Sequence, residues 1–349
     1  MKRFIVIALS LLIAAASFAQ TSPSFAWQSQ QSGLSSSLRG CSAVNEQIAW
    51  ISGANGKYAR TLDGGKTWQA DSIAGASALD FRDVQAFDAN TAYLMSAGPG
   101  ARSRIYKTTN GGKDWTMQYT LQDSTGFLDG FTFWDESNGI VFGDPIAGRI
   151  FILTTNDAGK TWQRLAPENA PQVVEGEYAF AASGTSIVAR DTSHVWIGTG
   201  GQAARVFHSA DRGKTWSVAS TPIVSGTESS GVFSLAFRDE KHGMAVGGDY
   251  RKEKEVLANV ARTADGGKTW TLLPNQTVAY RSCVAYVPHN GKVLLVAVGP
   301  SGADYSLDEG LTWRNISTVG YHTMSTGGTV ESIWAAGAEG RVARLELKR

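Results

Sequence analysis

Three arginines and one histidine occupy the same position in four similar segments of the chain. The segments are Leu38-Arg39-Gly40-Cys41, Phe81-Arg82-Asp83-Val84, Tyr280-Arg281-Ser282-Cys283 and Tyr321-His322-Thr323-Met324. Guanidinium groups bind carboxylate, phosphate or sulfate through paired, charge-assisted hydrogen bonds. We therefore expect an anion-binding or protein-binding site where these segments meet. The predicted ligand-binding residues are Arg39, Arg82, Arg281 and His322.

Acidic residues elsewhere in the chain leave two other interpretations open. In a glycoside hydrolase, two carboxyl groups flank the scissile bond and supply acid–base or nucleophilic chemistry. If the protein is an enzyme of this kind, the candidates for those roles are Asp129, Glu177 and Asp249. Alternatively, the arginines pair with local carboxylates and line a polar channel. The shared repeat position is the reason to expect a binding site, because a random scatter of arginines would not place three of them there.

Motifs for metal or cofactor chemistry do not occur in the sequence. The spacing of the five histidines is not that of metal ligands. There is no Gly-x-Ser-x-Gly, P-loop or Cys-x-x-Cys motif. We therefore predict no metal site and no cofactor.

An eight-residue pattern, Thr-x-Asp-Gly-Gly-Lys-Thr-Trp, recurs along the chain and must set the positions of these residues. Its six copies are Thr61–Trp68, Thr108–Trp115, Thr155–Trp162, Ser209–Trp216, Thr263–Trp270 and Ser306–Trp313. The closing tryptophans are 47, 47, 54, 54 and 43 residues apart. Aspartate and the glycines favour a tight turn, and each tryptophan offers a large apolar surface to a neighbouring unit. Short alternating apolar strands between Gly/Asn/Asp turns complete each unit.

A period in the forties with β-rich units predicts propeller blades. The fold we expect is all-β, a single seven-bladed β-propeller with N-to-C strand closure. Six blades follow from the six copies of the pattern. The seventh is split between residues 24–30 and 321–347, with Trp27 in the place of a pattern tryptophan. Joining the two ends in one sheet removes open strand edges.

The repeated pattern resembles the Asp-box, or BNR repeat. In families that carry it, the box is structural and lies on the propeller face away from the ligand site. With the phrases Ala-Val-Gly, Trp-Ile-Gly and Tyr-Lys-Thr-Thr-Asn-Gly-Gly, the chain resembles the photosystem II stability/assembly factor-like proteins. More distantly it resembles the sialidase superfamily, although Phe81-Arg82-Asp83-Val84 departs from the Phe-Arg-Ile-Pro motif of sialidases.

The first residues have the composition of a secretory signal. A basic start at Lys2 and Arg3, an apolar run from Phe4 to Ala16 and a small-x-Ala site predict a signal peptide at residues 1–19, cut after Ala19. The propeller would then occupy residues 20–349, in the periplasm or outside the cell.

The chain carries 32 basic and 31 acidic residues, so its charge is nearly balanced. This balance argues against nucleic-acid binding, and we expect no stable membrane insertion and a monomer. We also expect Cys41 and Cys283 to remain unbridged, since their strands lie two blades apart.

Together these patterns favour an exported, non-enzymatic binding or assembly scaffold. It would recognise a protein or an anionic ligand at the mouth of its central channel, as the resemblance to photosystem II assembly factor-like proteins implies. The alternative is a secreted, sialidase-like glycoside hydrolase.

Overall fold

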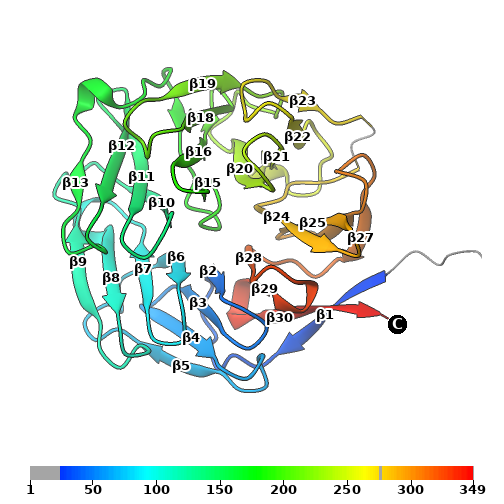
Figure 1. Ribbon diagram of the computed structural model, residues 1–349, viewed down its shortest axis with the longest axis horizontal. Helices are drawn as coiled ribbons and strands as arrows, with labels where there is room; N and C mark the ends of the chain where they lie inside the picture. The colour runs from blue at the N-terminus through cyan, green and yellow to red at the C-terminus, as the bar shows by residue number, and fades with distance from the viewer. Residues whose placement is uncertain (1–23, 275–276, 349) are drawn as a thin grey trace, which may run out of the picture.

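The structure of the protein is a computed structural model that describes residues 24–274 and 277–348. Its strands form seven sheets arranged as a ring (Figure 1). The prediction of a seven-bladed β-propeller is therefore confirmed. Among the described residues there are short 3₁₀ helices but no α-helix. The predicted signal peptide, residues 1–19, lies outside the described residues.

The blades are numbered along the chain, and each is given from its inner to its outer strand. Blade 1 has β2 (Leu38–Ala43), β3 (Ala49–Gly53), β4 (Lys57–Thr61) and β5 (Gln69–Ser72); blade 2 has β6 (Phe81–Ala86), β7 (Ala92–Ser96), β8 (Arg104–Thr108) and β9 (Thr116–Thr120); blade 3 has β10 (Leu128–Phe133), β11 (Gly139–Ile146), β12 (Arg149–Thr155) and β13 (Gln163–Arg164). Blade 4 has β15 (Ile187–Arg190), β16 (His194–Gly198), β18 (Arg205–Ser209) and β19 (Ser217–Ser220); blade 5 has β20 (Ser230–Phe237), β21 (Gly243–Asp249), β22 (Val260–Thr263) and β23 (Thr271–Leu272).

Blade 6 has β24 (Cys283–His289), β25 (Lys292–Gly299), β26 (Gly302–Ser306) and β27 (Arg314–Ser317); blade 7 has β28 (Thr323–Thr326), β29 (Ile333–Ala336), β30 (Val342–Lys348) and β1 (Ser24–Gln30). Two short strands, β14 (Glu177–Tyr178) and β17 (Gly200–Gly201), extend the sheet of blade 5. The 3₁₀ helices are η1 (Gly100–Arg102), η2 (Pro167–Asn169), η3 (Tyr250–Lys252), η4 (Val330–Ser332) and η5 (Ala338–Gly340).

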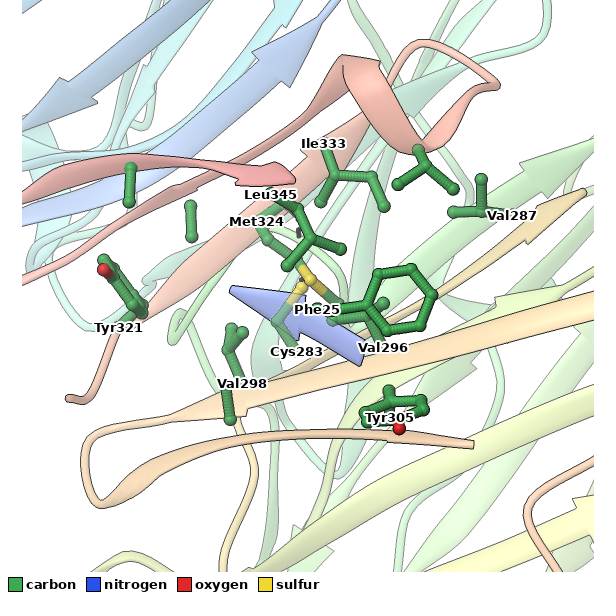
Figure 2. Close-up of a cluster of buried hydrophobic side chains, with 14 of the residues drawn as sticks. Phe25, Cys283, Val287, Val296, Val298, Tyr305, Tyr321, Met324, Ile333 and Leu345 are labelled. Atoms are coloured by element: carbon green, nitrogen blue, oxygen red, sulfur yellow. Dashed lines mark hydrogen bonds between the residues drawn. The ribbon is translucent and has the colours of Figure 1, made fainter. Parts of the chain in front are cut away.

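The outer strand of blade 7 comes from the start of the described chain. β1 pairs antiparallel with β30, and Trp27 lies opposite Leu345. Its residue Phe25 is buried and makes an edge-to-face contact with Tyr305 of blade 6, at 4.9 Å between ring centroids. Figure 2 shows Phe25 in the apolar cluster between blades 6 and 7, which also contains Cys283. β1 thus contributes both backbone pairing and apolar packing at the junction of the two ends of the ring.

The repeated eight-residue pattern forms the turn between the third and fourth strands of a blade, which we name the box turn. In the first copy, the Thr61 hydroxyl accepts a hydrogen bond from Gly65 N (2.8 Å) and donates to Asp63 (2.9 Å). The Asp63 carboxylate accepts from the amide (2.9 Å) and the hydroxyl (2.6 Å) of Thr67. The carboxylate is therefore fully engaged by its own turn, which supports a structural role for the pattern.

Antiparallel order decides which face of the ring each feature occupies. The first strand of a blade begins on one face, and the third strand ends on the other, where the box turn follows. The segments that carry Arg39, Arg82 and His322 therefore lie on the face opposite the box turns.

Candidate functional site

An insertion between blades 3 and 4 extends to the centre of the ring. It covers residues 165–186, and its last part, residues 179–186, is named here the channel segment. The inner strand of blade 4 begins only at Ile187, well after Phe180. Phe180 instead belongs to the channel segment.

The channel segment forms hydrogen bonds with each of the six blades other than blade 4. These hydrogen bonds join Arg39 Nη1 to Ala182 O (3.4 Å), Arg82 Nη1 to Ala181 O (3.4 Å), Ala179 N to Asp144 Oδ1 (3.2 Å), Thr185 Oγ1 to Ser234 Oγ (2.7 Å), Ser183 Oγ to Ser282 O (2.7 Å) and Thr323 Oγ1 to Ser183 O (2.9 Å). One short segment thus closes the central channel and forms the floor of the site above it.

Above this floor lies a pocket of about 360 Å³. Its wall comes from the starts of the inner strands and from nearby loops of the same face. The lining residues are Arg39, Arg82, Phe127, Asp129, Asp144, Ala179, Phe180, Ala181, Ala182, Phe233, Tyr250, Glu253, Tyr280, Ser282, Pro300 and His322. The structure therefore brings together three of the four predicted ligand-binding residues.

A β-bulge explains why these side chains face the pocket. In blades 1, 2, 3 and 5, the register between the first two strands shifts by one residue, and the extra residues are Arg39, Arg82, Asp129 and Phe233. A bulged residue is left out of the ladder and its side chain is re-aimed. All four of these residues line the pocket.

Arg39 is a half-buried cation without an ion-pair partner among the described residues. Within the described chain, its guanidinium donates one long hydrogen bond, at 3.4 Å, to the carbonyl oxygen of Ala182. Burial lowers the pKa of the Arg39 guanidinium, and the nearby charge of Arg82 lowers it further. The site therefore favours a ligand that supplies a negative charge here.

Arg82 and His322, which line the pocket together with Arg39, differ from it chemically. Arg82 already has an acidic partner, since its Nε lies 2.8 Å from the Asp80 carboxylate. Burial, together with the charges of Arg39, Arg341 and Arg82, lowers the pKa of His322 to about 4. At neutral pH this imidazole is uncharged, so it acts as a hydrogen-bond donor or acceptor and not as a third cation.

Arg281 does not line the pocket, because the predicted register is wrong by one residue in blade 6. The amide of Arg281 bonds to the carbonyl of Gly247, as the amide of Leu38 bonds to Gly337 and that of Tyr321 to Gly299. Arg281 is therefore equivalent to the buried Leu38, and Ser282 takes the place equivalent to Arg39.

The buried Arg281 side chain is held within its own blade. Its Nε and Nη2 atoms bind the Asp304 carboxylate, with Nε at 2.8 Å, and its Nη1 donates to Tyr280 O (2.8 Å) and Ser301 Oγ (3.1 Å). The only one of these partners that also lines the pocket is Tyr280. This arginine is thus a structural ion pair and is not presented to a ligand.

Of the three candidate catalytic carboxylates, only Asp129 lines the pocket. Glu177 is buried in an ion pair with Arg205, whose Nε donates to Oε1 at 3.0 Å. Asp249 is buried and caps η3 by accepting a hydrogen bond from Arg251 N (2.9 Å). Neither of these two lines the pocket with Asp129.

The aromatic wall of the pocket was not foreseen from the sequence. Phe180 stacks on Phe233, with ring centroids 4.0 Å apart and planes at 14°. Tyr280 meets the edge of Phe233 at 4.9 Å. The longer spacing of 54 residues between Trp162 and Trp216 was the available signal for the insertion that carries Phe180.

Other features that bear on function are limited. No group of three or more His, Cys, Asp or Glu side chains in residues 24–274 and 277–348 is arranged to hold a metal ion. Within the same residues, no helix is long and apolar enough to cross a membrane. Cys41 and Cys283 are both buried and free.

Comparison with known proteins places the fold among propellers. The solved structure of YCF48 bound to D1 peptide is 17% identical, with a TM-score of 0.59, and the match covers 91% of this chain and 94% of that chain. YCF48 from Cyanidioschyzon merolae is 17% identical, with a TM-score of 0.62 and 92% and 98% coverage. The WD40 propeller domain of Doa1 is 13% identical, with a TM-score of 0.60 and 93% and 98% coverage. At these identities the similarity establishes the fold.

A curated relative was found by sequence. A xyloglucanase of Paenibacillus sp. is 23% identical over an alignment of 289 residues, and the match covers 77% of this chain. The chain spans about a quarter of that relative's length, with 24% covered. No family model matches the chain. The protein is thus a β-propeller related in fold to YCF48.

Proposed function

We propose that this protein is an exported binding or assembly scaffold whose partner is another protein. In this proposal, an extended segment of the partner enters the mouth pocket and presents a carboxylate to Arg39. The protein acts in the periplasm or outside the cell, as a monomer and without a cofactor.

The proposal rests on the burial of Arg39 and on its lack of an ion-pair partner within the described residues. Its guanidinium is half-buried in a pocket of about 360 Å³ and has no ion-pair partner among the residues described. A desolvated cation without a counter-ion is costly, and a ligand carboxylate would complete the pair through charge-assisted hydrogen bonds. Neutral His322 and the rings of Phe233 and Tyr280 offer polar and apolar contacts beside it.

Similarity supports a peptide as the ligand. The YCF48 structure that shares this fold is bound to a D1 peptide. The mouth pocket has a closed floor and an aromatic wall, which suits a side chain or chain end that enters from one face.

The test is capture of partners from a native envelope extract with immobilised wild-type protein and with Arg39→Gln. Arg314→Gln, which changes an exposed arginine on β27, is the matched control. We expect at least one partner that the wild type and the control retain and that Arg39→Gln loses about ten- to hundredfold, as for a charge-assisted hydrogen bond. Identical partner sets for all three proteins would remove Arg39 from the site.

A glycoside hydrolase is the second candidate, favoured by one observation in the pocket. Burial raises the pKa of Asp129 well above its ordinary value, and the charge of Asp144 raises it further. A carboxyl group with a raised pKa is suited to the role of general acid. The similarity to a xyloglucanase points to the same class of enzyme.

This candidate is tested by incubating the protein with a fluorogenic sialoside and with xyloglucan oligosaccharides. Turnover that is lost in Asp129→Asn but kept in Asp249→Asn would support the enzyme. Absence of turnover by the wild type on both substrates would leave the scaffold as the better account.

A further inference from the structure

A buried carboxylate, that of Asp129, lies on the blade 3 side of the mouth pocket. It takes no part in the proposed contact between Arg39 and a carboxylate of the partner. Asp129 is only 2% exposed. Its Oδ2 atom is buried and has no hydrogen-bond partner among the residues that the structure describes. The same side chain lines the pocket, so a group that enters the pocket can supply the missing partner.

A second carboxylate adjoins it on the next strand. Leu128 of β10 pairs with Gly143 of β11, so the bulged Asp129 and Asp144 lie side by side at the end of this hairpin. Asp144 accepts one hydrogen bond at Oδ1, from the amide of Ala179 at 3.2 Å, and it too lines the pocket. Two neighbouring carboxylates in a desolvated site favour a cation or a strong hydrogen-bond donor.

Neither of the two arginines that line the pocket forms an ion pair with Asp129 or Asp144. Arg82 is the cation whose charge acts on Asp129, but it forms its ion pair with Asp80 and donates to Ala181 O. Arg39 donates to Ala182 O and forms no ion pair with a residue of the described chain. Within the described chain, the pocket therefore has a guanidinium without an ion pair on blade 1 and a carboxyl oxygen without a hydrogen-bond partner on blade 3.

We infer that Asp129 and Asp144 form a second subsite, which binds a lysine or arginine side chain of the same partner segment that Arg39 binds by a carboxylate. This inference rests on the proposed function and narrows it. The partner segment then carries one acidic and one basic group, and the aromatic wall of Phe180, Phe233 and Tyr280 packs against the apolar atoms between them.

Matching both subsites gives specificity. A segment with only the acidic group leaves Asp129 unpaired in the complex, which costs binding free energy. A segment with only the basic group leaves Arg39 unpaired in the same way. The pocket thus discriminates by the pair of charges and not by net charge.

The test is selection of binders from a library of random short peptides displayed on phage. Four forms of the protein are used: wild type, Arg39→Gln, Asp129→Asn and Asp71→Asn. Asp71 lies exposed on β5 and is the matched control for the aspartate change. Because Asp129→Asn keeps the shape of the side chain, thermal unfolding should show a folded protein; Asp144→Asn provides a second variant of the same subsite.

We expect wild type and Asp71→Asn to select peptides enriched in both an acidic group and lysine or arginine. Asp129→Asn should lose only the basic enrichment, and Arg39→Gln only the acidic one. For a selected peptide, replacing its basic residue by norleucine should weaken binding to wild type about ten- to hundredfold, and binding to Asp129→Asn by much less.

The possible failures are distinguishable. Acidic enrichment without basic enrichment on the wild type would overturn the second subsite and keep the proposed function. Basic enrichment that survives in both Asp129→Asn and Asp144→Asn would also overturn the subsite. Selection that gives the same peptides on wild type and Arg39→Gln, or none on the wild type, would overturn both proposals.

Discussion

The two faces of this propeller are built by different rules. On the box-turn face, a local pattern repeats: Thr61, Thr155 and Thr263 each bond the glycine four residues on and the aspartate two residues on. On the mouth face, equivalent positions differ from blade to blade: the bulged residue is arginine in blades 1 and 2, aspartate in blade 3 and phenylalanine in blade 5. The repeated face is determined by bonds within one turn, and the irregular face is the one with a pocket.

This difference indicates where a repeat protein can form a ligand-binding site. A residue whose hydrogen bonds are all made within its own turn has no free group with which to bind a ligand, as in the aspartates of the box turns. Among the described residues, Arg39 forms no ion pair, and Asp129 has one buried oxygen without a hydrogen-bond partner. The candidate site thus arises where the repeat is broken.

The first prediction removes the buried ion pair that distinguishes Arg281 from Arg39. In Asp304→Ala, the buried Arg281 guanidinium loses its counter-ion, and we expect the free energy of unfolding to fall by about 3–5 kcal/mol. Urea unfolding monitored by tryptophan fluorescence measures this loss. The double change Arg281→Met with Asp304→Leu should recover most of it, and a single Asp304→Ala variant as stable as wild type would contradict the assigned pair.

The second prediction compares two glycines with the same backbone conformation. Gly184, in the channel segment, and Gly75, in an outer loop, both have φ of 75°. A Cβ at Gly184 would lie 2.2 Å from Asp83 Oδ1, whereas a Cβ at Gly75 has no atom within 4 Å. We expect Gly184→Ala to cost about 2–4 kcal/mol and Gly75→Ala about 1–2 kcal/mol.

Equilibrium unfolding of both variants gives the comparison. The difference between them reports the steric part alone, since the backbone strain is shared. Equal costs would mean that the channel segment is not packed against blade 2.

The third prediction concerns a single box turn and has the smallest expected effect. Hydrogen bonds from the hydroxyl and amide of Thr67 lower the pKa of Asp63 to about 2. The folded pKa lies below the ordinary value, so this turn stabilises the fold fully above about pH 4 and loses that contribution as the pH falls through about 2.

Thr67→Val removes the hydroxyl and should raise the pKa of Asp63 toward its ordinary value of about 3.9. Carboxyl chemical shifts measured during an NMR titration report this change. Asp157, in another blade, should stay at about 2 in the same sample. If Asp63 titrates unchanged in the variant, the turn is not what lowers its pKa.

The sequence predicted the fold because the fold depends on local turns at a regular spacing. It predicted the positions of Arg39 and His322 for the same reason. The prediction for Arg281 was wrong, because a register shift of one residue in blade 6 can be recognised only once the strands are paired. That shift moves the Arg281 side chain from the pocket into the blade. The sequence also failed for the channel segment, because those residues belong to no repeat and their partners lie in the six other blades.

The most direct test compares Arg39→Gln with Arg281→Gln in one assay of stability and of binding to a peptide selected on the wild type. Our account predicts that Arg39→Gln keeps the midpoint of urea unfolding and loses binding about ten- to hundredfold, because the Arg39 guanidinium forms no ion pair within the described chain. It predicts that Arg281→Gln lowers the midpoint while its folded fraction binds like the wild type. Strong loss of binding in folded Arg281→Gln with full binding by Arg39→Gln would contradict the assignment of the site.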